Sequence, residues 1–144
     1  MVDPAPAPDR LPPALWRADA LMPNRSEAER ILGVRIRDVR DAKAAARALL
    51  DGGARIGIVK LGGDGLVWAA KSGVFYLPAF EVEAVDTTGA GDVFAGGLAA
   101  ALDRGAGWSE AIREAAAAAA LACTRPGTQT AAPTLEAVRR TGWL

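Results

Sequence analysis

Histidine is absent from the 144-residue sequence, and cysteine occurs once, at Cys123. Without histidine, the chain has no imidazole metal ligands and no histidine acid–base chemistry. A single cysteine excludes an intramolecular disulfide framework. Any general base in this protein must therefore be a carboxylate, a lysine or a tyrosine.

An excess of charge of either sign is also missing, because seventeen basic and seventeen acidic side chains cancel. Such a balance leaves no electrostatic footprint for nucleic acid or anionic lipid, so we expect neither partner. The alanine-rich run near residue 118 is too short and too broken to span a bilayer, and the first residues do not read as a secretion signal. We therefore expect a soluble, cytoplasmic protein with no membrane contact.

The length of the chain predicts one domain over residues 1–144, which is short for a complete α/β enzyme with two substrates. Five of the nine prolines fall within residues 1–13, which predicts an extended lead-in. Capping residues and apolar spacing predict helices at 11–20, 24–32, from Asp38 or Asp41 to Leu50, at 93–102, at 110–123 after a Ser109 cap, and at 133–140. Strands are predicted at 20–22 as a sheet edge, at 56–61, in a hairpin of 66–70 and 73–77, and at 80–85.

The stretch DTTGAGD at residues 86–92 lies between the predicted strand 80–85 and the predicted helix that begins at Val93. Two glycines let the backbone approach a ligand closely, and the following helix aims free N–H groups at it, which favours an anion site. Asp92 is an acid beside that anion, and a role in proton transfer explains its position better than a contribution to anion affinity does. The alternative is a glycine turn in which Asp92 only complements the helix dipole. Neither of the two familiar phosphate-binding loops matches this stretch.

A second glycine-rich turn, KLGGDG at residues 60–65, follows the predicted strand 56–61. Taken alone, it could equally be a tight turn that ends a strand. Both turns follow strands expected in one parallel sheet, so both would lie at its carboxyl edge, where ligands of open α/β sheets bind.

Other polar pairs have simpler explanations. Asn24 and Glu27 have the spacing of a capping box at a helix N-terminus. Glu110 and Glu114 lie four residues apart on one helix face, which favours solvated surface over a metal site. The small residues at 115–120 indicate a closely packed helix, and they would also let that helix press against a flat ligand.

These motifs resemble those of the ribokinase-like (PfkB) carbohydrate kinases. The run from Asp86 to Gly97 is similar to the second signature of that family, and MPNRSE at 22–27 resembles its Asn-x-x-Glu motif. VKLGGDG at 59–65 resembles its nucleotide loop, and TRPG at 124–127 its C-terminal loop. All four occur in family order, so the resemblance covers essentially the whole chain.

The resemblance implies a partial three-layer ribokinase-like α/β fold, with a mostly parallel sheet flanked by helices and a β-hairpin. It implies transfer of the ATP γ-phosphoryl group to a hydroxymethyl group of a sugar or sugar-like alcohol, with Asp92 as general base. The anion hole would consist of Gly89, Ala90 and Gly91. The implied nucleotide-binding residues are Asn24, Lys60, Leu61, Gly62, Gly63, Asp64, Gly65, Gly91, Asp92 and Ala116. Glu27 would help to organise Mg²⁺ through water, and a K⁺ loop would involve Asp86, Thr88, Ala122, Arg125, Gly127 and Ala131.

Two departures from the family accompany this resemblance. Ala116 stands where the family commonly has a polar residue near the nucleotide base, which implies looser adenine specificity. Members of the family are also about twice as long, so the chain looks like their C-terminal, ATP-binding half, without the sugar-binding signature and lid. A sugar kinase is therefore one hypothesis, and an inactive nucleotide-binding remnant or one half of a split enzyme is another. A third is an assembly role, as a homo-oligomer or paired with an N-terminal half through the exposed sheet edge.

Overall fold

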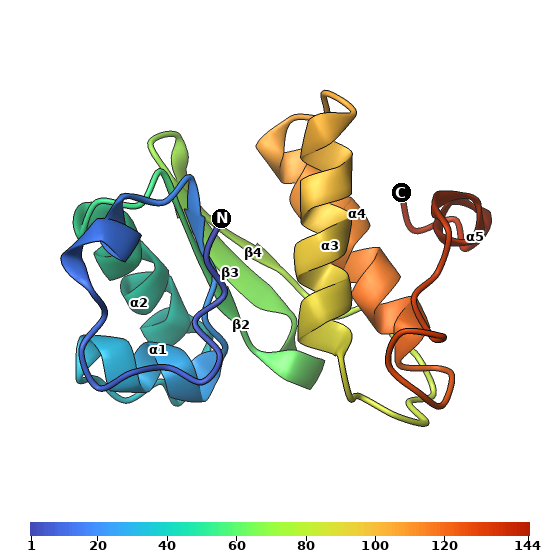
Figure 1. Ribbon diagram of the computed structural model, residues 1–144, viewed down its shortest axis with the longest axis horizontal. Helices are drawn as coiled ribbons and strands as arrows, with labels where there is room; N and C mark the ends of the chain where they lie inside the picture. The colour runs from blue at the N-terminus through green and yellow to red at the C-terminus, as the bar shows by residue number, and fades with distance from the viewer. The chain divides into compact units, whose positions relative to one another are not determined.

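The computed structural model describes all residues, 1–144, and its contacts divide them into two compact units, residues 1–78 and 79–144. Figure 1 follows the chain through these units from its blue N-terminus to its red C-terminus. Each unit is described by itself below. The prediction that residues 1–144 form one domain stays a prediction.

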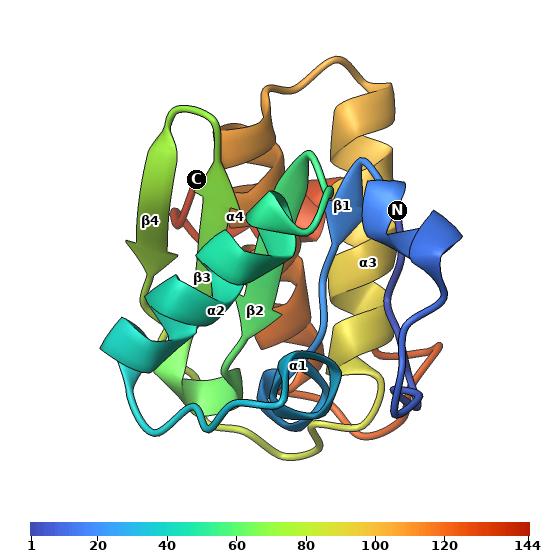
Figure 2. The ribbon, with the colours of Figure 1, turned by 90° about the vertical axis from the view of Figure 1, so that its left-hand side faces the viewer.

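A four-stranded sheet in the order β1-β2-β3-β4 forms the centre of the first unit (Figure 2). Its strands are β1 (Ala20–Leu21), β2 (Ile56–Lys60), β3 (Leu66–Ala70) and β4 (Gly73–Leu77). β1 and β2 are parallel, whereas β2, β3 and β4 are successively antiparallel. Val2 adds a parallel bridge on the other side of Leu21. The predicted hairpin is therefore confirmed, but the sheet within this chain is mixed rather than mostly parallel, because the hairpin supplies two of its four strands.

The helices of this unit begin and end where their capping residues predict. In α1 (Arg25–Leu32), Gly33 ends the helix at φ +66°, in the left-handed region. In α2 (Val39–Asp51), the Asp38 side chain accepts the N–H of Asp41 as an N-cap. The predicted helix at 11–20 is only a 3₁₀ turn, η1 (Pro13–Arg17), because the chain is already extended at Ala18.

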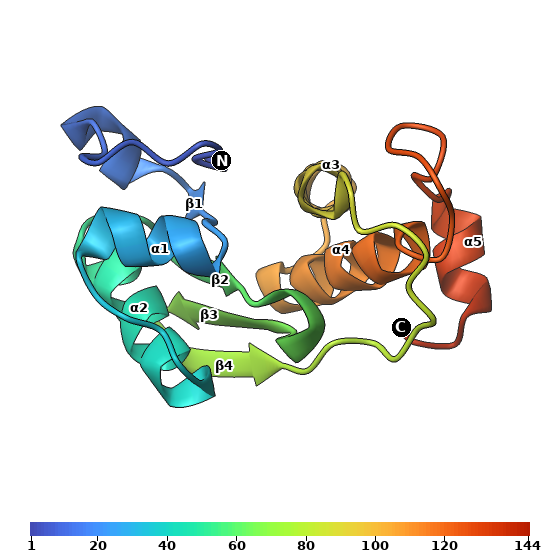
Figure 3. The same cartoon turned by 90° about the horizontal axis from the view of Figure 1, so that it is seen from below.

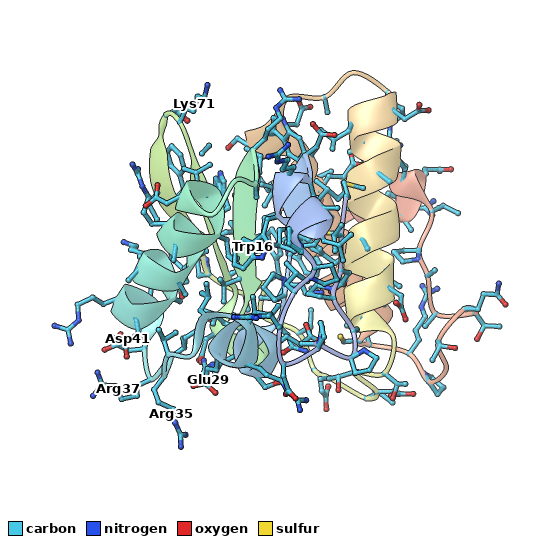
Figure 4. All side chains as sticks on the ribbon, turned by 60° about the vertical axis from the view of Figure 1, so that its left-hand side comes forward. Trp16, Glu29, Arg35, Arg37, Asp41 and Lys71 are labelled. Atoms are coloured by element: carbon cyan, nitrogen blue, oxygen red, sulfur yellow. The ribbon has the colours of Figure 1, made fainter.

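The connection between α1 and α2 is held by two carboxylates, which Figure 4 labels. Glu29 Oε1 accepts the N–H of Ile36 at 2.7 Å. Asp41 Oδ2 accepts both the backbone N–H and the Nε–H of Arg37, at 3.1 and 3.0 Å. These bonds fix the loop that returns the chain from α1 to α2.

Helix α2 packs directly on the sheet at Gly57. Buried alanines and Leu49 of the helix form one core with the strand residues Val59 and Val67. A Cβ at Gly57 would lie 2.4 Å from the carbonyl oxygen of Ala46 and 2.8 Å from Leu49 Cβ. Only glycine permits this approach of helix to strand, so position 57 sets where β2 lies.

The second unit consists of α3 (Ala90–Asp103), α4 (Trp108–Ala122) and α5 (Leu135–Arg140). α3 and α4 pack closely, since a Cβ at Gly97 would stand 3.3 Å from the Cα of Ala115. The N-cap of α4 is Gly107, so the prediction of Ser109 as the cap is wrong, and Ser109 lies in the first turn instead. No helix in the molecule is both long and apolar enough to traverse a bilayer.

The strand predicted at 80–85 does not form, and Figure 3 draws this segment as coil. A segment of alternating polarity forms a strand only where a neighbouring strand pairs with its backbone N–H and C=O groups. Here, the N–H groups of Val85 and Asp86 instead donate to the Cys123 carbonyl, at 2.8 and 3.1 Å. The segment is anchored at its start by Phe80, whose ring stacks on Trp143 with centroids 4.9 Å apart.

Candidate functional site

The first group of candidate residues lies where β1 and β2 end. Asn24 and Lys60 form a parallel bridge, and the Lys60 N–H donates to the Pro23 carbonyl at 3.0 Å. The predicted nucleotide turn begins at Lys60, so the structure brings the Asn24 motif and the turn side by side. Both lie at the carboxyl ends of parallel strands, where ligands bind in open α/β folds.

The turn itself is built around two glycines in the left-handed region, Gly62 at φ +62° and Gly65 at φ +89°. Its internal hydrogen bonds use the N–H groups of Leu61, Asp64 and Gly65. None of these bonds uses the N–H of Gly62 or Gly63. A Cβ added at either of these two glycines would meet no atom within 4 Å, so the turn leaves room for ligand atoms.

Asn24 and Glu27 form the capping box that their spacing predicts. Asn24 Oδ1 accepts the Glu27 N–H at 3.0 Å, and Glu27 Oε2 accepts the Asn24 N–H at 2.7 Å. Ser26 Oγ donates to the same Asn24 oxygen at 2.9 Å. These bonds use neither the Asn24 side-chain amide nor Glu27 Oε1, so the box leaves a donor and an acceptor for other partners.

Two charged pairs near this turn were not foreseen from the sequence. Lys60 Nζ donates to Asp3 Oδ2 at 2.5 Å, while Asp3 Oδ1 is buried with no hydrogen-bond partner. Arg25 Nη2 donates to Asp64 Oδ2 at 2.6 Å. No local sequence pattern points to Asp3, because the Val2–Leu21 bridge that brings it to this sheet edge is a long-range feature of the fold.

The second group begins at the N-terminus of α3. Gly89 is the N-cap, with φ +77° and no side-chain capping bond. A Cβ there would lie 3.2 Å from Thr128 Cβ, so the positive φ favours glycine and a larger residue would press against Thr128. Asp92 is exposed in the first turn of the helix. The helix therefore presents an N-terminus without a side-chain cap and a solvent-facing carboxylate together, in an arrangement that can receive an anion and a proton.

Asp86 ties this turn to the loop that follows α4. Its Oδ1 accepts the Thr88 N–H at 2.9 Å, and its Oδ2 accepts the Gly127 N–H at 3.1 Å. Hydrogen bonds from Thr88, and then from Gly127, hold the pKa of the Asp86 carboxyl below its usual range. Asp86 thus contacts two other residues predicted for the K⁺ loop, Thr88 and Gly127.

The other predicted residues of the second unit lie on α4 and the loop after it. Ala116 is half-buried on α4, and Ala131 is buried in the loop. The carbonyl of Ala122 accepts the Arg125 N–H at 3.2 Å. Glu114 pairs with Arg104, and its side chain is 14% exposed, so it is less solvated than its spacing predicts. No cluster of three or more acidic or cysteine side chains suits a metal ion.

A cavity of about 370 Å³ opens elsewhere on the first unit, between η1 and the end of α2. Trp16, labelled in Figure 4, forms one wall, and Gly52 and Gly53 form another. None of the predicted site residues lines it. The chemistry of the glycine turns, rather than the size of this cavity, therefore defines the candidate site.

Comparison with known proteins agrees with these motifs. The model of the pfkB family carbohydrate kinases matches residues 1–135. Ribokinase of Haemophilus influenzae is 37% identical over 134 residues, which are 93% of this chain and 44% of that protein. The crystal structure of Thermotoga maritima ribokinase is 38% identical with a TM-score of 0.84, over 96% of this chain and 46% of that one. Arabidopsis thaliana ribokinase complexed with ribose and ATP is 29% identical with a TM-score of 0.83, over 92% and 44%.

These matches define a sugar-kinase class with a partial ribokinase-like α/β fold, and they confirm the predicted fold class. The chain belongs to the pfkB family of carbohydrate kinases. It spans less than half the length of the relatives reported above.

Proposed function

We propose that the chain carries the phosphoryl-transfer chemistry of an ATP-dependent sugar kinase, with Asp92 as the general base. The observation that carries the proposal is the α3 N-terminus, which lacks a side-chain cap and holds an exposed carboxylate in its first turn. In a carbohydrate kinase, that pairing suits a γ-phosphate next to the hydroxyl that attacks it. The acceptor is a sugar or sugar-like alcohol, and ribose is the first to test because similar proteins are named ribokinases.

The proposed reaction divides into two tasks. Asp92 takes the proton of the sugar hydroxyl as its oxygen bonds to the γ-phosphorus, and the bond from that phosphorus to the ADP oxygen breaks. The backbone N–H groups of Gly89, Ala90 and Gly91 stabilise the negative charge on the transferring oxygens. Since the helix macrodipole favours anions at its N-terminus, it supports both the phosphate and the ionised base.

The nucleotide is assigned to the residues at the ends of β1 and β2. We assign phosphate contacts to the Asn24 amide and to the turn 60–65, and the nucleotide base to the surface near Ala116. Glu27 Oε1 fits a role in holding water on Mg²⁺, because hard divalent cations prefer oxygen ligands. Bound Mg²⁺ would neutralise charge on the ATP phosphates. We also propose a K⁺ site surrounded by Asp86, Thr88, Ala122, Arg125, Gly127 and Ala131. The reaction is proposed to take place in the cytoplasm.

A second candidate is a nucleotide-binding remnant, or one half of a split enzyme. The observation that favours it is that Asn24 and the turn 60–65 lie in the first compact unit, whereas Asp92 lies in the second, so these proposed nucleotide residues do not include the base in their own unit. Such a chain would bind nucleotide at the same residues and would not transfer its phosphoryl group.

The two candidates are separated by a melting experiment and a transfer assay on the same preparation. Saturating Mg·ATP raises the melting temperature under both, since a ligand that binds only the folded state stabilises it. The kinase additionally transfers ³²P from [γ-³²P]ATP to ribose or another sugar in a panel with Mg²⁺ and K⁺. Stabilisation without labelled sugar phosphate supports the remnant, and no stabilisation at all refutes both.

A further inference from the structure

An acidic residue stands in the middle of the glycine turn. Asp64 is the last residue of the 3₁₀ turn η2 (Gly62–Asp64), and its side chain is 65% exposed. A carboxylate carried by a phosphate-binding turn repels the phosphates it is meant to receive. An unbalanced Asp64 would therefore weaken nucleotide binding.

The structure supplies a balancing charge from another element. Arg25, the first residue of α1, donates from Nη2 to Asp64 Oδ2 at 2.6 Å, and the two residues are 39 positions apart in the sequence. Tyr76 of β4 donates its hydroxyl to the Asp64 carbonyl oxygen at 2.9 Å. Arg25 thus holds the Asp64 carboxylate, and Tyr76 holds the Asp64 backbone.

The neighbouring lysine is already engaged. Lys60 Nζ is paired with Asp3, and both side chains are largely buried. Its ammonium therefore does not neutralise Asp64. Arg25 is the cation that contacts the carboxylate of the turn, and it follows directly after Asn24.

The geometry points to Arg25 as a positioning residue that neutralises Asp64 and so lets an acidic glycine turn accept nucleotide phosphates. This inference rests on the proposed function, in which the turn 60–65 binds the nucleotide. It assigns Arg25 no contact with the phosphates: the arginine acts through Asp64. Removing the acid should therefore remove the need for the arginine.

The test measures the Kd for Mg·ATP by isothermal titration calorimetry in about 50 mM NaCl. Arg25→Gln should raise Kd by about two- to fivefold, which is the size of effect that exposed ion pairs produce. Asp64→Asn should bind more tightly than the unsubstituted chain, because it removes a negative charge beside the phosphates. The double variant should recover most of the loss of Arg25→Gln, and Arg25→Lys should bind within about twofold of the unsubstituted chain. In about 500 mM NaCl the ratio of the Kd of Arg25→Gln to that of the unsubstituted chain should fall towards one, because salt screens an exposed charge.

The matched control is Arg47→Gln, which breaks an exposed pair with Asp51 within α2. It changes the net charge by the same amount and should leave Kd unchanged. The inference is overturned if Arg25→Gln binds as well as the unsubstituted chain, or if the double variant binds as weakly as Arg25→Gln, because Arg25 would then act directly. An unsubstituted chain that does not bind Mg·ATP refutes the proposed function, and the role of Arg25 falls with it.

Discussion

Two glycines six residues apart should respond in opposite ways to the same substitution. At Gly57, an added Cβ would lie 2.4 Å from the Ala46 carbonyl oxygen and 2.8 Å from Leu49 Cβ. At Gly63, it would meet nothing within 4 Å, and the backbone there is outside the left-handed region. Gly57→Ala therefore tests whether α2 rests directly on β2, and Gly63→Ala is its control.

The expected magnitude follows from which atoms must move. The carbonyl oxygen of Ala46 belongs to the helix backbone, so no side chain can rotate away, and α2 has to shift until the contact reaches at least 3.4 Å. Overpacking of this kind costs about 1–3 kcal/mol, and the backbone contact places Gly57→Ala near about 3. At about 3 °C per kcal/mol for a chain near this size, the melting temperature should fall by about 9 °C. Gly63→Ala should leave it unchanged or raise it slightly, since alanine restricts the unfolded chain by about 0.4–1 kcal/mol.

Thermal unfolding followed by far-UV circular dichroism measures both variants under one condition. Equal melting temperatures for Gly57→Ala and the unsubstituted chain would refute the packing of α2 on β2. A large fall for Gly63→Ala would show that the space beside the turn is filled.

Three further predictions concern hydrogen bonds and backbone conformation. The pKa of Asp86 is lowered from 3.8 in the folded protein, so its hydrogen bonds stabilise the fold above that pH and lose this effect as the pH falls through the lower folded value. Asp86→Asn should therefore show less acid destabilisation than the unsubstituted chain between about pH 5 and 2, measured as melting temperature against pH. Asn24→Ala should remove the N-cap of α1 and cost about 1 kcal/mol in urea unfolding, whereas Ser26→Ala should cost less, because the Asn24 oxygen keeps its bond to Glu27. Gly89→Ala should cost about 1–2 kcal/mol through its positive φ and its contact with Thr128, and Thr128→Ala should relieve part of that loss in the double variant.

Local sequence signals predicted most of the first unit. A hairpin is predicted at residues 66–70 and 73–77, where β3 and β4 lie, because a two-residue polar turn separates two apolar runs. Gly33 and Asp38 end and begin helices as capping chemistry requires. The strand predicted at 80–85 does not form, because alternating polarity describes the two faces of a strand and does not show whether a partner strand is present.

The candidate site was predictable in its motifs and not in its charge pairs. Glycine spacing predicts the turn at 60–65, whereas the turn predicted at 86–92 ends at Gly89, because Ala90, Gly91 and Asp92 form the first turn of α3. The pairs of Lys60 with Asp3 and of Arg25 with Asp64 join residues 57 and 39 positions apart. Contacts over such separations depend on how the strands pair, which local pattern does not encode.

If Asp92 is the base of phosphoryl transfer, Asp92→Asn should lose transfer and keep nucleotide binding, so both are measured for this variant and for the unsubstituted chain. Transfer of ³²P from [γ-³²P]ATP to the sugar identified in the panel gives kcat, and calorimetry gives the Kd for Mg·ATP. We expect kcat to fall by about 10²–10⁴-fold, which is the effect of losing a general base, and Kd to stay within about twofold. An unchanged kcat, or a loss of nucleotide binding as large as the loss of transfer, would contradict it.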